Sequence, residues 1–273
     1  LAHQMITNLQ EQGHNIWGEI YPYAAGSTPI NAEFLEPESW IDDLGKRYED
    51  TMMNPDTGEF YTLETYKATV ASEPTRPIVI FKMPAEDQAK WLTLKGVTMA
   101  SDAVGATPYD APWDYPMEKL GGTHPRTAGA RGATIRLGRE NNIPMMQLMS
   151  ILSYTAAKHL GDTGLKFMQE RGRIQKGMVA DIVVFDPETF TDNSTYEQGA
   201  IPSTGMKAVI VNGQIVVRDD VQLPVFPGQP IRFEPEAKPR FVPISLEAWN
   251  AEFSTGMPMP SDFTGAFPQK VEN

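Results

Sequence analysis

Cysteine is absent from this sequence of 273 residues, and histidine occurs only 4 times. The missing cysteine excludes disulfide bonds, thiolate metal ligands and a cysteine nucleophile from this chain. Basic residues are also few, with 23 Lys and Arg against 35 Asp and Glu and a net charge of −12. Because the few basic residues form no long run, this balance argues against nucleic-acid binding.

Long apolar runs are missing as well. No run approaches the roughly 20 residues that a membrane helix requires, so we expect no membrane segment, and no signal-peptide pattern is visible. The chain begins at Leu1 rather than Met, which predicts precursor cleavage or a split gene. The lack of cysteine and the acidic charge favour the periplasm as the compartment, with the cytoplasm as the alternative.

Hydrophobic residues make up 41% of the chain, and the many glycines and prolines are typical of a loop-rich α/β enzyme. Apolar spacing predicts helices over 3–13, 38–50, 61–72, 85–94 and 144–160, and strands over 15–21, 76–81, 96–100 and 182–185. The order strand, helix, strand over 76–100 predicts a βαβ unit with two neighbouring parallel strands. Residues 103–133 are predicted to form a long loop.

The pattern changes to β-structure from residue 172 onward. Asn212-Gly213 lies between the apolar runs 208–211 and 214–217 and predicts a hairpin. Past residue 235 the chain is rich in proline and aromatic residues. We expect this part to be a tail that packs over other surfaces, such as those of a partner.

The most informative stretch is Val-Thr-Met-Ala-Ser-Asp at 97–102. An apolar run of strand length ends abruptly at Asp102, and a carboxylate at the tip of a buried strand can bind a metal or transfer a proton. On position alone, a turn or helix-capping role for Asp102 stays open. Three further segments follow downstream: Gly-Gly-Thr-His-Pro-Arg at 121–126, Thr-Ala-Ala-Lys-His-Leu-Gly at 155–161 and Gly-Met-Val-Ala-Asp-Ile-Val-Val-Phe-Asp at 177–186.

The order of these segments resembles the end of a metal-dependent amidohydrolase, most of all the D-aminoacylase branch. Tyr21-Pro22-Tyr23 is similar to the segment after that family's sixth barrel strand, and Ser101-Asp102 is similar to the tip of its eighth strand. The resemblance implies an α/β fold in three parts. These are the C-terminal part of a TIM-like (β/α)8 barrel over 1–165, a small β-sandwich domain over 166–235 and the tail over 236–273.

The resemblance also implies the roles of single residues. Asp102 would be the catalytic residue and a metal ligand, and it would take a proton from metal-bound water. Tyr23, His124 and Arg126 would bind the substrate, Tyr23 by donating to oxyanion charge and Arg126 by holding a carboxylate. Packing for Tyr23 and loop stabilisation for His124 remain the alternatives. Tyr21 is expected to be structural.

The remaining histidines, His3, His14 and His159, are expected to be structural, because none forms a His-x-His pair or ends a strand. After His-Pro-Arg the sequence departs from the family's usual continuation, so the substrate preference cannot be transferred. Arg131, in the divergent segment, is a candidate for the charge that relatives place elsewhere.

One aspartate cannot hold zinc, because a catalytic zinc site uses about three protein ligands. The resemblance therefore implies one or two Zn²⁺ ions with most ligands from the N-terminal chain of the same enzyme. We predict a subunit or fragment of a metal-dependent amidohydrolase that cleaves the amide bond of N-acyl amino acids or similar small amides, in a higher oligomer. The alternatives are a cyclic amidase or dipeptidase of the same superfamily and a non-catalytic scaffold subunit.

Overall fold

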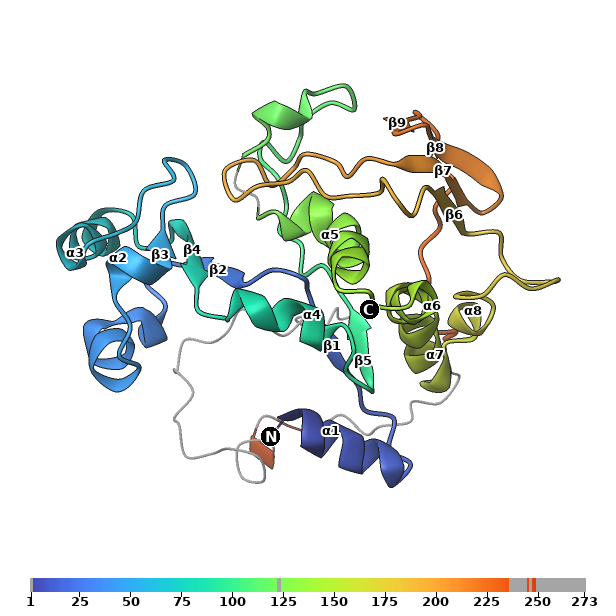
Figure 1. Ribbon diagram of the computed structural model, residues 1–273, viewed down its shortest axis with the longest axis horizontal. Helices are drawn as coiled ribbons and strands as arrows, with labels where there is room; N and C mark the ends of the chain where they lie inside the picture. The colour runs from blue at the N-terminus through green and yellow to red at the C-terminus, as the bar shows by residue number, and fades with distance from the viewer. Residues whose placement is uncertain (1, 122–123, 236–244, 246, 249–273) are drawn as a thin grey trace. The chain divides into compact units, whose positions relative to one another are not determined.

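The computed structural model describes residues 2–121, 124–235, 245 and 247–248 (Figure 1). The chain divides into two compact units, Leu1–Phe233 and Glu234–Asn273. All elements described below belong to the first unit, and they mix helices with strands as the α/β prediction requires. The predicted tail over 236–273 lies almost wholly outside the described residues. No helix in the described part is long and apolar enough to cross a membrane.

Two short parallel strands lie side by side, β1 (Gly18–Ile20) and β5 (Val97–Met99) (Figure 1). They confirm the strands predicted over 15–21 and 96–100 within shorter bounds. Helix α1 (Ala2–Glu11) packs on β1, because Ile6 reaches the position that a side chain at Gly18 would occupy. On the other side, the buried core around Met99 comes from several helices and one loop. Its members are Leu92, Met99, Ile135, Leu148, Ile151 and Phe190.

An inserted unit follows β1 and has a sheet of its own. The sheet is antiparallel with the order β2-β4-β3, and its strands are β2 (Ala25–Pro29), β3 (Met52–Met53) and β4 (Pro77–Phe81). Four helical segments complete the unit: η1 (Glu33–Leu35), the π-helical η2 (Glu38–Asp43), α2 (Tyr48–Thr51) and α3 (Leu63–Ser72). The helix predicted over 61–72 is thus confirmed, and the one predicted over 38–50 is split in two.

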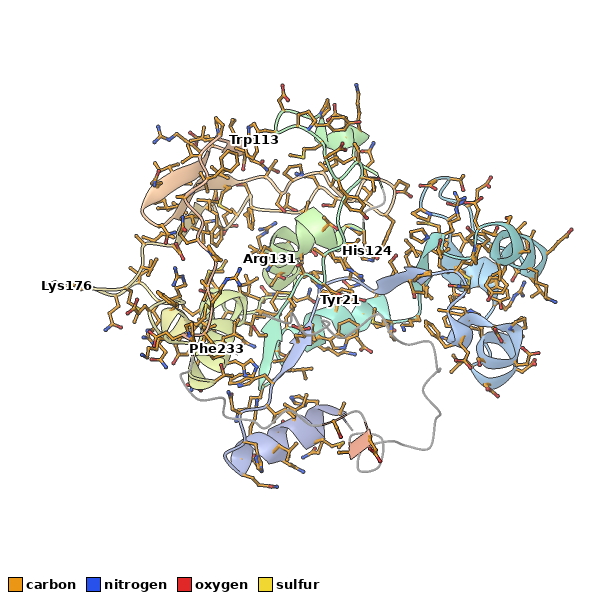
Figure 2. All side chains as sticks on the ribbon, turned by 180° about the vertical axis from the view of Figure 1, so that it is seen from behind. Tyr21, Trp113, His124, Arg131, Lys176 and Phe233 are labelled. Carbon is orange, nitrogen blue, oxygen red and sulfur yellow. The ribbon has the colours of Figure 1, made fainter. Side chains whose placement is uncertain are left out.

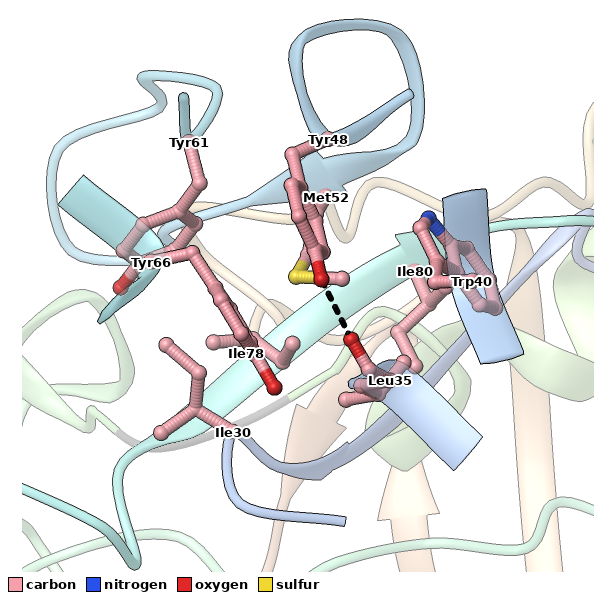
Figure 3. Close-up of a cluster of buried hydrophobic side chains, with 9 residues drawn as sticks. All are labelled: Ile30, Leu35, Trp40, Tyr48, Met52, Tyr61, Tyr66, Ile78 and Ile80. Carbon is pink, nitrogen blue, oxygen red and sulfur yellow. Dashed lines mark hydrogen bonds between the residues drawn. The ribbon is translucent and has the colours of Figure 1, made fainter. Parts of the chain in front are cut away.

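Aromatic side chains fill the core of the inserted unit (Figure 3). Tyr48 stacks on Tyr66 with ring centroids 4.4 Å apart, and its hydroxyl donates a 2.6 Å hydrogen bond to the carbonyl of Leu35. The buried core residues are Ile30, Leu35, Trp40, Tyr48, Met52, Tyr61, Tyr66, Ile78 and Ile80. None of them belongs to the core around Met99, so the insert carries its own hydrophobic stabilisation.

The predicted βαβ unit over 76–100 is wrong in its strand pairing. β4 is hydrogen-bonded to β2 and β3, whereas β5 pairs with β1. The physical reason is that Ile78 and Ile80 are buried in the core of the insert, which holds β4 away from β5. The predicted helix over 85–94 is confirmed in a shorter form, as η3 (Ala85–Asp87) and α4 (Gln88–Trp91).

The predicted loop over 103–133 is wrong in its last part, because α5 (Arg126–Glu140) begins inside it. Its three glycines hide the helix in the sequence, since each disfavours a helix by roughly 1 kcal/mol. All three have a packing role, and Gly138 lies against the buried side chain of Leu148. A Cβ atom at Gly132 would lie 2.6 Å from the backbone nitrogen of Asp192, and one at Gly129 would meet the hydroxyl of Tyr23.

The helix predicted over 144–160 is confirmed with an interruption. It consists of α6 (Met145–Met149), the π-helical η5 (Ser150–Tyr154) and α7 (Thr155–Asp162). The hydroxyl of Thr98 in β5 donates to the carbonyl of Ile151 at 2.8 Å and so fixes the π-helical part against the parallel strands. Two short helices lie outside this run, η4 (Met117–Lys119) and α8 (Lys166–Gln169).

The last strands form one antiparallel sheet with the order β6-β7-β8-β9. Its strands are β6 (Ile182–Phe185), β7 (Met206–Val211), β8 (Gln214–Arg218) and β9 (Val221–Gln222). Asn212 and Gly213 have positive φ angles of 46° and 76°, as the predicted hairpin requires. The described residues thus contain one parallel strand pair and one four-stranded antiparallel sheet, and the barrel and the sandwich stay predictions.

The contact at Gly132 leads to a stability prediction. We expect Gly132→Ala to lower the free energy of unfolding by about 1–3 kcal/mol, because backbone atoms of residues 191–192 leave no space for a methyl group. Chemical denaturation of the purified chain would measure the change. The matched control is Gly161→Ala in α7, where the nearest atom is in the flexible side chain of Gln169. Equal stability of the two variants would contradict the packing role of Gly132.

Candidate functional site

Asp102 lies just beyond β5 and presents its carboxylate to solvent, with 62% of the side chain exposed. Its φ angle of 49° falls in the left-handed region, which aspartate tolerates better than most residues. Arg126 holds this conformation from two sides. Its Nε donates to the carbonyl of Asp102 at 2.6 Å, and its Nη2 lies 3.1 Å from Oδ2 of the carboxylate. The predicted catalytic residue is therefore exposed and oriented by one cation.

Arg126 stands at the first position of α5, and only 5% of its side chain is exposed. Its guanidinium lies 4.9 Å from the ring centroid of Tyr21, a cation–π arrangement. Burial raises the pKa of Tyr21, with the charge of Arg126 opposing and that of Asp102 adding to the shift. The structural role of Tyr21 stays a prediction, and its contact with Arg126 was not predicted. Its position directly after β1 was the available signal, because Asp102 follows the neighbouring strand in the same way.

His124 is buried, with 1% of its surface exposed, and both ring nitrogens have partners. Nε2 lies 3.0 Å from the carbonyl of Ala25, and Nδ1 accepts a 3.1 Å hydrogen bond from the backbone N–H of Arg126. The network therefore assigns the proton to Nε2. Burial, assisted by the nearby charge of Arg126, lowers the pKa of His124 to about 3. A neutral His124 thus joins the start of α5 to the start of β2.

Tyr23 is also buried, and its ring meets His124 edge to face at 5.8 Å. Its hydroxyl donates to Oδ2 of Asp192 at 3.1 Å, and Oδ1 of Asp192 accepts a 2.7 Å hydrogen bond from Arg136. Burial raises the pKa of Tyr23, and the charge of Asp192 raises it further. The hydroxyl proton that was predicted to face an oxyanion is directed at Asp192 in this structure.

Tyr196 covers the other side of His124. Its ring packs edge to face on His124 at 5.1 Å and on Phe81 of β4 at 4.9 Å. Burial raises its pKa to about 12. Sequence reasoning missed both Asp192 and Tyr196, because they follow β6 and carry no motif that links them to the strand tips. Figure 2 labels Tyr21 and His124, which meet edge to face at 6.2 Å.

The four predicted site residues, Tyr23, Asp102, His124 and Arg126, are thus brought into one contact network. Arg131 lies on α5 outside that network (Figure 2). The residue is exposed, and no hydrogen bond or ion pair joins it to the other described residues.

A metal ion needs more donors than the described residues assemble. Nowhere in that part of the chain do three or more His, Asp or Glu side chains gather around a common point. Both ring nitrogens of His124 are hydrogen-bonded, so neither is available to a metal ion. Asp102 does offer an exposed carboxylate as a metal ligand. The described residues therefore do not fit a complete metal site, and Asp102 can supply at most one part of one.

No protein-family model matches the chain. Three curated proteins from Alcaligenes xylosoxydans xylosoxydans match the chain in sequence. A D-aminoacylase is 29% identical over 151 residues, which is 55% of this chain and 27% of the relative. An N-acyl-D-glutamate deacylase is 26% identical over 217 residues, 76% of this chain and 40% of the relative. An N-acyl-D-aspartate deacylase is 36% identical over 97 residues, 34% of this chain and 18% of the relative.

Solved structures of the same kinds of enzyme are similar to this chain in fold. The crystal structure of D-aminoacylase, described as defining a novel subset of amidohydrolases, aligns with a TM-score of 0.60 and 20% identity. The alignment covers 81% of this chain and 44% of that one. N-acyl-D-glutamate deacylase from Bordetella bronchiseptica, complexed with zinc and a phosphonate inhibitor, aligns with a TM-score of 0.57 and 22% identity over 78% of this chain and 42% of that one. A further solved structure of D-aminoacylase, described for the role of its binuclear metal centre, also aligns with a TM-score of 0.60 and 20% identity.

The fold is similar to that of the D-aminoacylase and N-acyl-D-glutamate deacylase structures, which are amidohydrolase-type α/β proteins. In sequence, the chain is similar to a D-aminoacylase and to N-acyl-D-amino-acid deacylases, which agrees with the predicted resemblance. It spans well under half the length of the curated relatives it matches. This partial coverage is consistent with the predicted C-terminal portion.

The buried neutral His124 predicts a pH dependence of stability. Its pKa is about 3 in the folded chain against 6.5 when exposed, so its contribution is complete above pH 6.5 and is lost as the pH falls from 6.5 toward 3. Between pH 7 and pH 5 we expect a loss of about 2 kcal/mol in the free energy of unfolding. His124→Gln should remove most of this loss, measured by denaturant titration at both pH values.

The control for this prediction is His14→Gln, since His14 is exposed in the loop after α1. That variant should keep the pH dependence of the wild type. If His124→Gln and His14→Gln lose the same stability between the two pH values, then His124 is not the group that titrates.

Proposed function

We propose that this chain is the C-terminal part of a metal-dependent amidohydrolase that cleaves the amide bond of N-acyl amino acids. N-acyl-D-amino acids, after which its relatives are named, are the first substrates to test. The observation that carries the proposal is the exposed Asp102 carboxylate at the tip of a parallel strand, oriented by the buried Arg126. The same geometry suits a cyclic amidase or dipeptidase, which would differ in the pocket around Asp102.

The role that we assign to Asp102 is proton transfer. As water attacks the carbonyl carbon of the amide, the carboxylate accepts a proton from the water oxygen. When the C–N bond breaks, Asp102 delivers that proton to the leaving nitrogen and returns to its starting state. Arg126 keeps the carboxylate in place for both transfers through its contacts of 2.6 Å and 3.1 Å. Exposure of the carboxylate makes it accessible to a small substrate.

The substrate-binding residues enter the proposal in two ways. Arg126 and Tyr21 lie against Asp102, and a substrate carboxylate would reach the guanidinium through the small part of Arg126 that stays exposed. His124 and Tyr23 are buried, so they would form the wall behind these groups and shape the binding pocket. The hydroxyl of Tyr23 would reach an oxyanion only after leaving Asp192.

One or two zinc ions belong to the proposal, with support from the binuclear metal centre of D-aminoacylase and the zinc in the N-acyl-D-glutamate deacylase complex. The described residues do not form a metal site by themselves, so we assign no step of the reaction to a metal here. Asp102 would contribute one ligand or lie beside the ion, and the remaining ligands would come from another polypeptide.

A second polypeptide, the N-terminal part of the same enzyme, is the proposed partner in a larger oligomer. Two features of the described residues support it. The sheet of β1 and β5 leaves one edge of each strand unpaired, and such edges are normally covered. In addition, a groove of about 590 Å³ between α6, η5 and β6 is lined by Met146, Ile174 and Val183. Ile174 and Val183 are 87% and 54% exposed, which is unusual for apolar side chains that lie together.

The activity prediction concerns Asp102→Asn in the assembled enzyme. We expect turnover of N-acyl-D-amino acids to fall by about 10²–10⁴-fold, because the amide cannot accept the proton, while the thermal unfolding temperature stays close to that of the wild type. A colorimetric assay of the released amine would measure the rate. Asp110→Asn, an exposed acid in the following loop, should stay within twofold. Turnover within a few-fold of the wild type for Asp102→Asn would refute the role.

The partner prediction concerns the groove. Intact-mass analysis of the purified particle should show a second chain together with the 30.3 kDa chain, and metal analysis should show bound zinc. We expect Val183→Glu to weaken the assembly at least tenfold, because it places a charge on the apolar lining. Val221→Glu, at the opposite edge of the same sheet, is the matched control. A lone, metal-free chain would favour the scaffold alternative.

A further inference from the structure

A segment between β6 and β7, residues 191–204, lies directly on helix α5. We call it the Asp192 segment. Its two ends are joined by the β-bridge between Thr191 and Thr204, and Ser203 donates to the carbonyl of Ala128 at 3.3 Å. The missing side chains at positions 129 and 132 of α5 allow this close approach. The segment was predicted to belong to the small β domain, yet it packs beside the candidate site.

Asp192 is the buried acid of this segment, with 8% of its side chain exposed. Its Oδ1 accepts from Nε of Arg136 at 2.7 Å, and its Oδ2 accepts from Arg136 Nη2 at 3.3 Å and from the hydroxyl of Tyr23 at 3.1 Å. Arg136 also reaches Glu140 at 3.2 Å on the solvent side. The carboxylate is thus held by donors from α5 and from the strand tip after β1, which restricts it to one position.

These contacts continue from Asp192 to the catalytic candidate. Tyr23, which donates to Asp192, packs edge to face on His124. Tyr196, from the same segment, packs on His124 as well. His124 in turn accepts the backbone N–H of Arg126, whose side chain orients Asp102. The Asp192 segment therefore contacts His124 directly through Tyr196. It also acts on His124 indirectly, because Asp192 is hydrogen-bonded to Tyr23, whose ring packs on His124.

We propose that Asp192 is a positioning residue for the Asp102–Arg126 pair, and that it acts through Tyr23 and His124. The proposal rests on the amidohydrolase function proposed above. Asp192 touches neither the solvent-exposed carboxylate of Asp102 nor the space in front of it. Its effect on the reaction arises because the buried carboxylate and its charged hydrogen bonds fix the Tyr23 ring, and with it the ring of His124.

The test is a double-mutant cycle in the assembled enzyme with Asp192→Asn, Tyr23→Phe and the double variant. We expect each single variant to lower kcat about tenfold with little change in KM, and the double variant to be no slower than the slower single variant. This non-additivity follows because both changes act on the same hydrogen bond: Asp192→Asn removes the charge of its acceptor, and Tyr23→Phe removes its donor. Glu140→Gln, which removes only the exposed partner of Arg136, should leave kcat within twofold.

Two kinetic outcomes would overturn the proposal. In the first, the losses multiply in the double variant, which would show that Asp192 and Tyr23 act independently. In the second, Asp192→Asn lowers the unfolding temperature but leaves kcat unchanged, which would show a structural role alone. If Asp192→Asn does not fold, Tyr23→Phe carries the test, since it keeps the pair of Asp192 with Arg136 and removes only the hydrogen bond.

Hydrogen–deuterium exchange on the full chain separates this proposal from the proposed function, because it needs no substrate. We expect Asp192→Asn to speed exchange about tenfold in peptides covering residues 21–26 and 124–128, where Arg126 N–H is bonded to His124, and Glu140→Gln to leave both peptides unchanged. Faster exchange in an enzyme that cleaves no N-acyl amino acid would reject the function and support the positioning. Unchanged exchange would reject the positioning, whatever the activity.

Discussion

The ion pair between the buried Arg126 and the exposed Asp102 is the interaction on which the site depends. Burying a guanidinium is costly unless its donors are satisfied, and here the carbonyl and the carboxylate of Asp102 both accept from it while Tyr21 covers its face. The pair ties the tip of β5 to the first turn of α5. Because Tyr21 follows β1, the tips of both parallel strands meet at this single cation.

His124 connects this pair to the rest of the chain. One ring nitrogen binds the start of α5 and the other binds Ala25, where the inserted unit begins. The insert has its own aromatic core and therefore does not draw on the packing around the parallel strands. As a result the described residues contain these two separate hydrophobic cores. The neutral, buried His124 joins the inserted unit to the start of α5.

Sequence reasoning succeeded where the signal is local. The apolar run that ends at Asp102 predicted a strand with a carboxylate at its tip, and Asn212-Gly213 predicted the hairpin, because backbone geometry at those points depends on neighbouring residues. It failed for the start of α5, because the glycines that allow close packing of this helix also favour a loop in the sequence pattern. It also failed for the partner of β4, because Ile78 and Ile80 suit either of two cores and only packing chooses between them.

The sequence by itself determined the α/β class, most strands and helices, the relationship to the deacylases and the presence of Asp102, His124 and Arg126 in one motif order. Only the tertiary structure decided that Tyr21 lies under Arg126 and that Tyr23 faces Asp192, 169 residues further along the chain. The physical reason is that periodicity and motif order are properties of the chain itself. The partner of a buried polar group depends instead on which distant segment packs against it.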